Sequence, residues 1–108
     1  GLAHITGGGL IENPPRSFNP KLSAEIDVKT WEMPSVYHWL IKTGRIESME
    51  LARTFNCGMG MIVIVKPDRA EPVIEKLQDN GENVFQIGRL KPRAPSEQSV
   101  TLQNIDNW

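Results

Sequence analysis

The sequence predicts an α+β fold in which helices cover a mixed β-sheet. Two strand patterns and one helix pattern lead to this prediction. Apolar and polar residues alternate over 22–28, which is typical of a half-exposed strand, and the uninterrupted apolar run at 61–65 is typical of a strand buried on both faces. Residues 67–81 carry apolar side chains at helical spacing, and the two kinds of segment alternate along the chain.

The first half of the chain is expected to hold two strands and three helices. Residues 1–6 form an apolar strand, and a short helix at about 8–13 ends at two prolines, because proline cannot donate a hydrogen bond. The alternating strand at 22–28 comes next. A helix at about 34–44 starts at a Pro-Ser pair and stops at a glycine, and residues 47–55 continue as another helix.

The second half is expected to hold three strands and the clearest helix of the chain. That helix, at 67–81, has a candidate capping box at its start, formed by Asp68 and Glu71. It follows the buried apolar strand. Two last strands at about 84–90 and 99–104 complete the order β-α-β-α-α-β-α-β-β.

Several side chains are predicted as packing residues. Val36, Trp39 and Leu40 are three and four residues apart and form the apolar face of their helix, so Trp39 is expected in the core, as is Trp31. Cys57 is predicted to be a small buried residue, because no base partner is evident for a nucleophile.

Composition and charge exclude several classes of function. Twelve Lys and Arg against 13 Asp and Glu give a net charge of -1, which argues against nucleic acid or an anionic membrane as an electrostatic partner. No apolar run reaches the roughly 18 residues of a membrane span. The single cysteine forms neither an internal disulfide nor a structural zinc site, and the two histidines lie too far apart for a metal site. A reducing, cytoplasmic location is the simplest expectation.

The chain reads as part of a longer protein. It has no initiator Met, and its first residues look like the end of a strand already under way. We therefore expect a partial domain over residues 1–103 and a short tail over 104–108, which either frays or docks through Trp108.

Three consecutive glycines, Gly7 to Gly9, stand between the first strand and the first helix. Glycine permits positive φ angles and close approach to a ligand, and a strand, a glycine loop and a helix N-terminus together often bind an anion. Two interpretations stay open: a phosphate cradle to which Thr6 adds a hydroxyl, and a tight turn without a ligand. The spacing matches neither the Walker loop nor GxGxxG.

A second unusual stretch is RTFNCGMG at 53–60, and candidate anion contacts lie in it and near the first loop. Arg53 is a candidate for bidentate contact with phosphate, and Arg16 is either an anion contact or a solvated loop residue. Asn56 is equally consistent with a left-handed cap beside Gly58. From its position alone, His4 is best interpreted as a hydrogen-bonded strand residue.

The two stretches GLAHITGGGLIENPPR and RTFNCGMGM together resemble the phosphoribosylformylglycinamidine cyclo-ligase family, also called AIR synthetases. The similarity continues through AEIDVKTWEMPSVYHWL and NGENVFQIGRL, from Gly1 to about Leu102. Two motifs in this order, with a tryptophan-containing segment between them, are more specific than either alone. The resemblance implies the later part of the family's C-terminal domain, without the N-terminal domain.

The resemblance implies an enzyme of de novo purine biosynthesis. Such enzymes use ATP, with Mg²⁺, to activate the formyl amide oxygen of formylglycinamidine ribonucleotide. The amidine nitrogen then closes the imidazole ring of aminoimidazole ribonucleotide, and ADP and phosphate are released. The family also implies a homodimer, an N-terminal domain that carries much of the ATP site, and an active site in the cleft between the domains. This fragment alone is expected to be inactive.

The resemblance also implies roles for single residues. His4 becomes a candidate for a polar contact or proton transfer in catalysis, and no metal ligand is expected in this chain. The residues expected to contact substrate or phosphate are Thr6, Gly7, Gly8, Gly9, Asn13, Arg16, Arg53, Thr54, Asn56 and Gly58.

Two alternative functions remain open. One is a sister ATP-dependent enzyme of the same two-domain plan, of the selenophosphate synthetase, thiamine-monophosphate kinase, hydrogenase-maturation or formylglycinamidine ribonucleotide synthetase type. The other is a non-catalytic module that keeps an anion pocket. Substrate-dependent release of ADP separates the enzymes, and a reading frame that extends upstream of Gly1 argues against the module.

Overall fold

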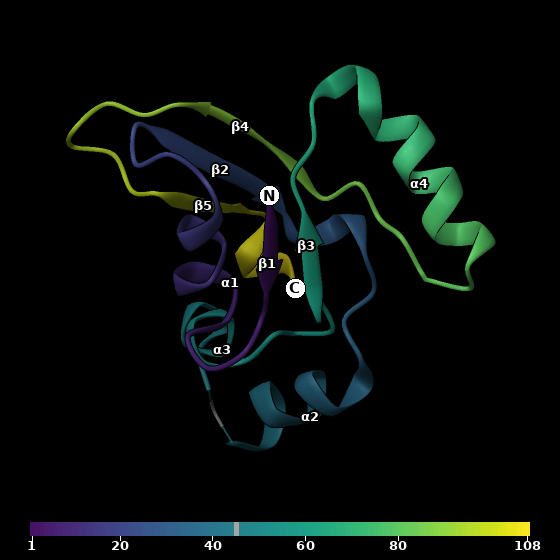
Figure 1. Ribbon diagram of the computed structural model, residues 1–108. Coiled ribbons are helices and arrows are strands. Elements are labelled where there is room, and N and C mark those ends of the chain that lie inside the picture. Colours follow the sequence, from purple (N-terminus) through teal and green to yellow (C-terminus); the bar gives the residue numbers. More distant parts are fainter. Residues whose placement is uncertain (45) are drawn as a thin grey trace.

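A computed structural model describes residues 1–44 and 46–108 and confirms the predicted order of strands and helices (Figure 1). The strands are β1 (Leu2–His4), β2 (Leu22–Asp27), β3 (Met61–Val63), β4 (Gly88–Pro92) and β5 (Val100–Gln103). The α-helices are α1 (Gly9–Glu12), α2 (Ser35–Gly44), α3 (Ser48–Thr54) and α4 (Ala70–Asp79). Short 3₁₀ helices join them: η1 (Pro14–Ser17), η2 (Val28–Thr30), η3 (Pro67–Arg69) and η4 (Ile105–Asn107).

The α+β class is confirmed, with the strands divided between two sheets. One sheet is mixed and has the order β4-β2-β5, in which β2 runs antiparallel to β4 and parallel to β5. The other contains β1 and β3, which are antiparallel. The prediction that the strand at 22–28 is half-exposed is wrong, because Ala24 and Ile26 are buried on one face of β2 and Ser23 is buried on the other. Cover on both faces agrees with the central place of β2 in its sheet.

The prediction that the strand at 61–65 is buried on both faces is wrong. Ala3 and Ile62 are cross-strand partners on the inner face of the β1–β3 sheet, where they pack in or against the core. On the other face, the side chains of Leu2, Met61 and Val63 are 67%, 54% and 39% exposed. The sheet is thus apolar on both sides, and the described residues cover only one of them.

Trp31 is buried in the core, which confirms one of the two predicted tryptophans. Its indole Nε1–H donates to the backbone oxygen of Cys57 over 3.0 Å, and the ring of Trp108 packs edge-on against it at a centroid distance of 6.1 Å. Trp39 is not a core residue, since it is 60% exposed on α2, as is Val36 at 55%. Helix α2 packs instead through Tyr37, Leu40 and Ile41.

Helix α4 is confirmed as a helix but not in its start. The 3₁₀ turn η3 precedes it, no side chain caps its N-terminus, and the predicted capping box of Asp68 and Glu71 is absent. The helix lies apart from α1 and α3, on the other side of β3 (Figure 1). None of the helices in the described ranges is long and apolar enough to cross a membrane.

The first of the two last strands is shifted from its predicted position. Strand β4 begins four residues later than expected, at Gly88, which pairs with Ile26. The backbone of β2 comes so close there that an added Cβ on Gly88 would overlap the backbone of Glu25. Only glycine allows the backbones of β4 and β2 to come this close, so Gly88 fixes the register of the pairing between the two strands.

We expect Trp31→Phe to lower the free energy of unfolding by about 1–3 kcal/mol, because the substitution removes a buried hydrogen bond and leaves the Cys57 carbonyl unpaired. The matched variant Trp39→Phe should change it by less than about 0.5 kcal/mol, since Trp39 is exposed. Urea denaturation followed by circular dichroism measures both. Equal losses for the two variants would contradict this description of the core.

Candidate functional site

The two glycine-rich stretches meet at one end of the β1–β3 sheet (Figure 1). His4 pairs with Met61, and the N–H of Ile5 donates to the backbone oxygen of Gly60 over 2.9 Å. Because the strands are antiparallel, β1 ends where β3 begins. The first loop therefore leaves the sheet at the place where the second one enters it, although about fifty residues separate them in the sequence.

The first glycine loop combines an open backbone with one tightly packed residue. Gly8 and Gly9 have φ angles of 98° and 57°, in the left-handed region that favours glycine. An added Cβ on Gly9 would overlap the backbone oxygens of Ala52 and Phe55 at the end of α3. Gly9 is therefore a packing residue, which binds the first loop to the helix that leads into the second.

Gly7 and Gly8 are more available than Gly9. Within the part of the chain that the structure describes, their N–H groups have no protein acceptor. A Cβ on Gly7 would meet nothing within 4 Å, and its φ lies outside the left-handed region. Since α1 is a single turn of four residues, its dipole adds little, and any anion binding would rest on these N–H groups and the exposed Thr6.

Asn13 is buried, with only 4% of its surface exposed, and its carboxamide faces the first loop. Its Oδ1 accepts a hydrogen bond from the N–H of Thr6 over 2.7 Å, and its Nδ2 donates to the oxygen of Gly7 over 3.2 Å. The side chain thus closes the loop on itself. This use of the carboxamide could not be read from the sequence, because the pattern of Asn followed by two prolines only marks a helix end.

An asparagine also organises the second glycine loop. Asn56 Oδ1 accepts from the N–H of Gly58 over 2.9 Å and from the hydroxyl of Tyr37 over 3.1 Å. Of the two interpretations of Asn56, the left-handed cap is wrong, because Cys57 and Gly58 take that conformation instead, with φ angles of 54° and 99°. Gly58 also lies against Pro34, where an added Cβ would come within 2.7 Å of the ring.

Cys57 is buried, as the sequence predicted. Burial raises the pKa of its thiol to about 12, because the thiolate would lose its hydration. The thiol is therefore a packing group and is protonated at neutral pH.

The remaining predicted site residues are exposed. His4 is on the outer face of β1, opposite Met61, and Arg16 is on η1. Arg53 pairs with Glu50 one turn before it on α3, with 3.1 Å between Nη1 and Oε2. In the described ranges, no hydrogen bond joins the side chains of this last group to one another: His4, Thr6, Arg16, Arg53 and Thr54.

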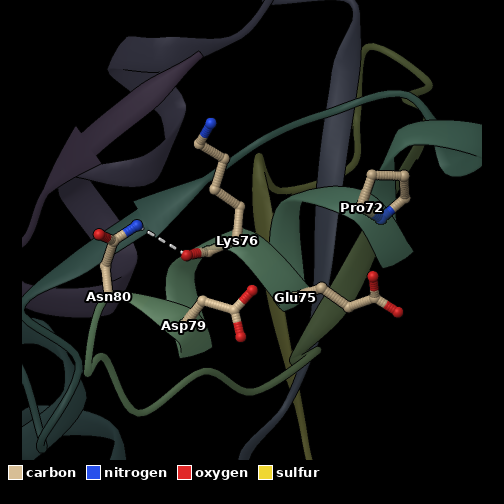
Figure 2. A pocket seen from close by; sticks show the side chains of 5 residues that line it. All are labelled: Pro72, Glu75, Lys76, Asp79 and Asn80. Carbon is tan, nitrogen blue, oxygen red and sulfur yellow. Dashed lines mark hydrogen bonds between the residues drawn. The ribbon is translucent and has the colours of Figure 1, made fainter.

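Two shallow depressions lie elsewhere on the surface. The first, of about 360 Å³, is on α4, and Figure 2 shows the side chains that line it: Pro72, Glu75, Lys76, Asp79 and Asn80. The second, of about 470 Å³, lies over β2, β4 and β5 and includes Glu25 and Arg89. Neither contains a residue that the sequence predicted for the site. Among the described residues, no group of three or more His, Cys, Asp or Glu side chains is placed to hold a metal.

Comparison with known proteins places these loops in a family. Residues 1–98 match the family model described as AIR synthase related protein, C-terminal domain. All 108 residues are 45% identical to the bifunctional purine biosynthetic protein ADE1 of Schizosaccharomyces pombe, covering 14% of that protein. Over 93 residues, 86% of the chain, identity to the bifunctional purine biosynthetic protein PUR2,5 of Pichia angusta is 50%, covering 12% of that protein.

A bacterial relative is shorter. Over 102 residues, or 94% of the chain, identity to the phosphoribosylformylglycinamidine cyclo-ligase of Neisseria meningitidis strain FAM18 is 46%, covering 30% of that protein. The chain therefore spans less than a third of each of these relatives.

We expect Cys57 to resist alkylation while the protein is folded. With a thiol pKa of about 12, roughly one molecule in ten thousand carries a thiolate at pH 8. Iodoacetamide labelling followed by mass spectrometry should show no modification without denaturant. It should show complete modification in about 6 M guanidinium, above the roughly 5 M midpoint that marks a hyperstable domain. Rapid labelling of the folded protein would contradict the burial of this thiol.

Proposed function

The chain belongs to the AIR synthase related protein family and comprises its C-terminal domain region, and from this premise we propose that it is part of a phosphoribosylformylglycinamidine cyclo-ligase. The observation that carries the proposal is the meeting of the two glycine-rich loops at one end of the β1–β3 sheet, in a chain that is 46% identical to a relative of that name. The chain would help to form the active site and would be inactive alone.

The proposed reaction closes an imidazole ring in purine synthesis. The formyl amide oxygen of formylglycinamidine ribonucleotide is phosphorylated at the expense of ATP. The amidine nitrogen then bonds to the activated carbon, and the C–O bond breaks, releasing phosphate beside the ADP already formed. Both the nucleotide and the substrate carry phosphate, so a site for phosphate oxygens is the contribution that this chain's loops can make.

The first glycine loop is the proposed phosphate site. Support comes from the N–H groups of Gly7 and Gly8, which have no acceptor among the residues that the structure describes, and from the exposed Thr6 beside them. Backbone N–H groups of this kind can donate to phosphate oxygens. The Glu12 side chain lies beside Gly8, where an added Cβ would come within 2.7 Å of its Oε2, so we propose that this carboxylate moves aside when phosphate binds. We propose that Mg²⁺, which the ATP would bring, takes its protein ligands from the rest of the protein.

His4, Arg16, Arg53 and Thr54 stay proposals as contacts around this loop. His4 is exposed beside the loop's entry, and a proton-transfer role would need substrate within hydrogen-bond reach of its ring. Arg53 is held by Glu50, so contact with a phosphate would require that the guanidinium leave or share this ion pair. An exposed pair of this kind contributes less than about 1 kcal/mol, so a phosphate can compete for the arginine.

Gly7 offers the sharpest test of the phosphate site. Gly8 is in the left-handed region and Gly9 is packed on α3, so substitutions there would strain the fold whether or not a ligand binds. Gly7→Ala keeps the backbone N–H but adds one methyl group in open space, where the methyl group would hold a phosphate away from the N–H. In the complete protein that contains this chain, we expect Gly7→Ala to raise the KM for ATP or for formylglycinamidine ribonucleotide roughly tenfold to a hundredfold, the effect of one lost phosphate hydrogen bond.

The measurement is ADP release that depends on formylglycinamidine ribonucleotide, with detection of the aminoimidazole product. Gly44→Ala serves as the control, because a Cβ there meets only the Ile46 side chain at an ordinary 3.5 Å, at the end of α2. Unchanged kinetics in Gly7→Ala would remove the phosphate site from this loop. A folded, ATP-binding wild-type protein without this ADP release would instead overturn the cyclo-ligase proposal in favour of a sister enzyme.

We also propose that the outer face of the β1–β3 sheet is covered in the complete protein by its N-terminal part. Support for the covering comes from the apolar side chains of Leu2, Met61 and Val63 on this face and from the greater length of the relatives.

The complete protein is proposed to be cytoplasmic and homodimeric, as the family resemblance implies.

Met61→Glu tests this covering. In the 108-residue chain we expect a change of no more than about 0.5 kcal/mol in the free energy of unfolding, because Met61 is 54% exposed. In the complete protein the same variant should lose about 3 kcal/mol, the penalty for an unpaired buried charge. Gln78→Glu on α4 adds the same charge at an exposed position and is the control. Equal effects of Met61→Glu in both proteins would contradict the covering.

A further inference from the structure

We propose that Asn13 is a positioning residue that aims the Gly8 N–H toward a bound phosphate and does not itself contact the ligand. This inference rests on the proposed function for its phosphate. The geometry of the loop, however, can be tested without any ligand.

The first step is that both ends of the Asn13 carboxamide are bound to the loop, at Thr6 and Gly7. The backbone of Asn13 is also engaged, because its N–H donates to the oxygen of Gly9 over 3.3 Å and its oxygen accepts from Arg16 over 3.2 Å. With 4% exposure, the residue is fixed between α1 and η1 and is not presented to solvent.

The second step is that only a carboxamide of this length satisfies the loop. The Thr6 N–H needs an acceptor and the Gly7 oxygen needs a donor. Asparagine supplies one of each from a single planar group, which also fixes which atom is oxygen and which is nitrogen. An ionised aspartate of the same shape has no donor and would place negative charge against the Gly7 oxygen.

The two hydrogen bonds from Asn13 to Thr6 and Gly7 form a clamp on the loop. The third step connects this clamp to the ligand. In a trans peptide the C=O of one residue and the N–H of the next point in opposite directions, and the peptides here are trans. Because the Gly7 oxygen is held toward the buried Asn13 amide, the Gly8 N–H is turned away from it. Two adjoining glycines would otherwise allow this peptide plane to rotate at little cost.

The test is Asn13→Asp in the complete protein, studied between pH 5.5 and pH 8, roughly one to four units above the usual pKa of aspartate. Burial and the facing carbonyl both raise the pKa of a carboxyl at this position. At high pH the ionised group repels the Gly7 oxygen, and as the pH falls the protonated carboxyl regains an O–H donor. We expect the KM of the variant for its phosphate-bearing ligand to be raised about tenfold at pH 8 relative to wild type, and to approach wild type at pH 5.5.

Asn80→Asp is the matched control. Asn80 Nδ2 donates to the backbone oxygen of Lys76 over 2.8 Å on the exposed end of α4, as Figure 2 shows, so the same chemical change is made far from the loop. It should show no pH-dependent recovery of KM relative to wild type. Equal KM ratios for the two variants across this pH range would overturn the positioning role.

Nuclear magnetic resonance of protein labelled with ¹⁵N-glycine separates this proposal from the proposed function. Without ligand, the amide signals of Gly7 and Gly8 in Asn13→Asp should differ from wild type at about pH 8, where the introduced carboxyl is ionised. They should converge with wild type at about pH 5.5, because burial raises the pKa of this carboxyl and it becomes protonated there. Coincident signals at both pH values would overturn the clamp even if the enzyme assay succeeds. Movement of the signals in a protein without cyclo-ligase activity would keep the clamp and discard only the function.

A wild-type measurement covers the case in which Asn13→Asp does not fold. The Thr6 amide, which donates to a buried acceptor, should exchange with solvent at least about tenfold more slowly than the Gly7 and Gly8 amides. Exchange of all three at one rate would overturn the proposal without any variant.

Discussion

The contact of Gly9 with the end of α3 is the constraint on which the rest of the site depends. The absence of a side chain lets the backbone of the first loop lie against the carbonyl oxygens of Ala52 and Phe55, which are the last groups of the helix before the second loop. Oxygens at a helix end have no partner within the helix, and backbone packing of this kind leaves no room for adjustment. The two loops are thereby placed relative to each other by backbone atoms, whose positions vary less than those of side chains.

The core continues this arrangement into the second loop. Trp31 donates to the backbone oxygen of Cys57, and Tyr37 donates to the side chain of Asn56, so two different segments hold one loop. The left-handed conformation of Cys57 costs energy for a residue with a side chain, and it persists because the thiol is buried and the carbonyl is bound. Trp108 packs on Trp31 from the C-terminus, and in this way the last residue of the chain supports the same loop.

Local patterns predicted what depends on neighbours in sequence and failed where neighbours in space decide. The start of α2 after Pro34 and its end at Gly44 follow from local signals, and both are confirmed. Spacing alone places Trp39 on the apolar face of its helix but cannot say whether another element covers that face. Here none of the described residues buries Trp39. The capping box at Asp68 and Glu71 gave way to a 3₁₀ turn that begins at a proline. The clamp by Asn13 needs the loop to fold back over six residues, which no periodicity reveals.

The two asparagines show how a glycine-rich loop can be both open and fixed. Glycines allow a ligand to approach the backbone, but they also give the unfolded loop more conformations to lose. A side chain that bonds to the loop from one side removes part of this freedom without covering the whole backbone. Asn13 does so for the first loop, with hydrogen bonds of 2.7 and 3.2 Å to Thr6 and Gly7. Asn56 does so for the second loop, with hydrogen bonds of 2.9 and 3.1 Å to Gly58 and Tyr37. In the phosphate site proposed for the first loop, the donors would already be oriented, so less of the binding energy would be spent on ordering the chain.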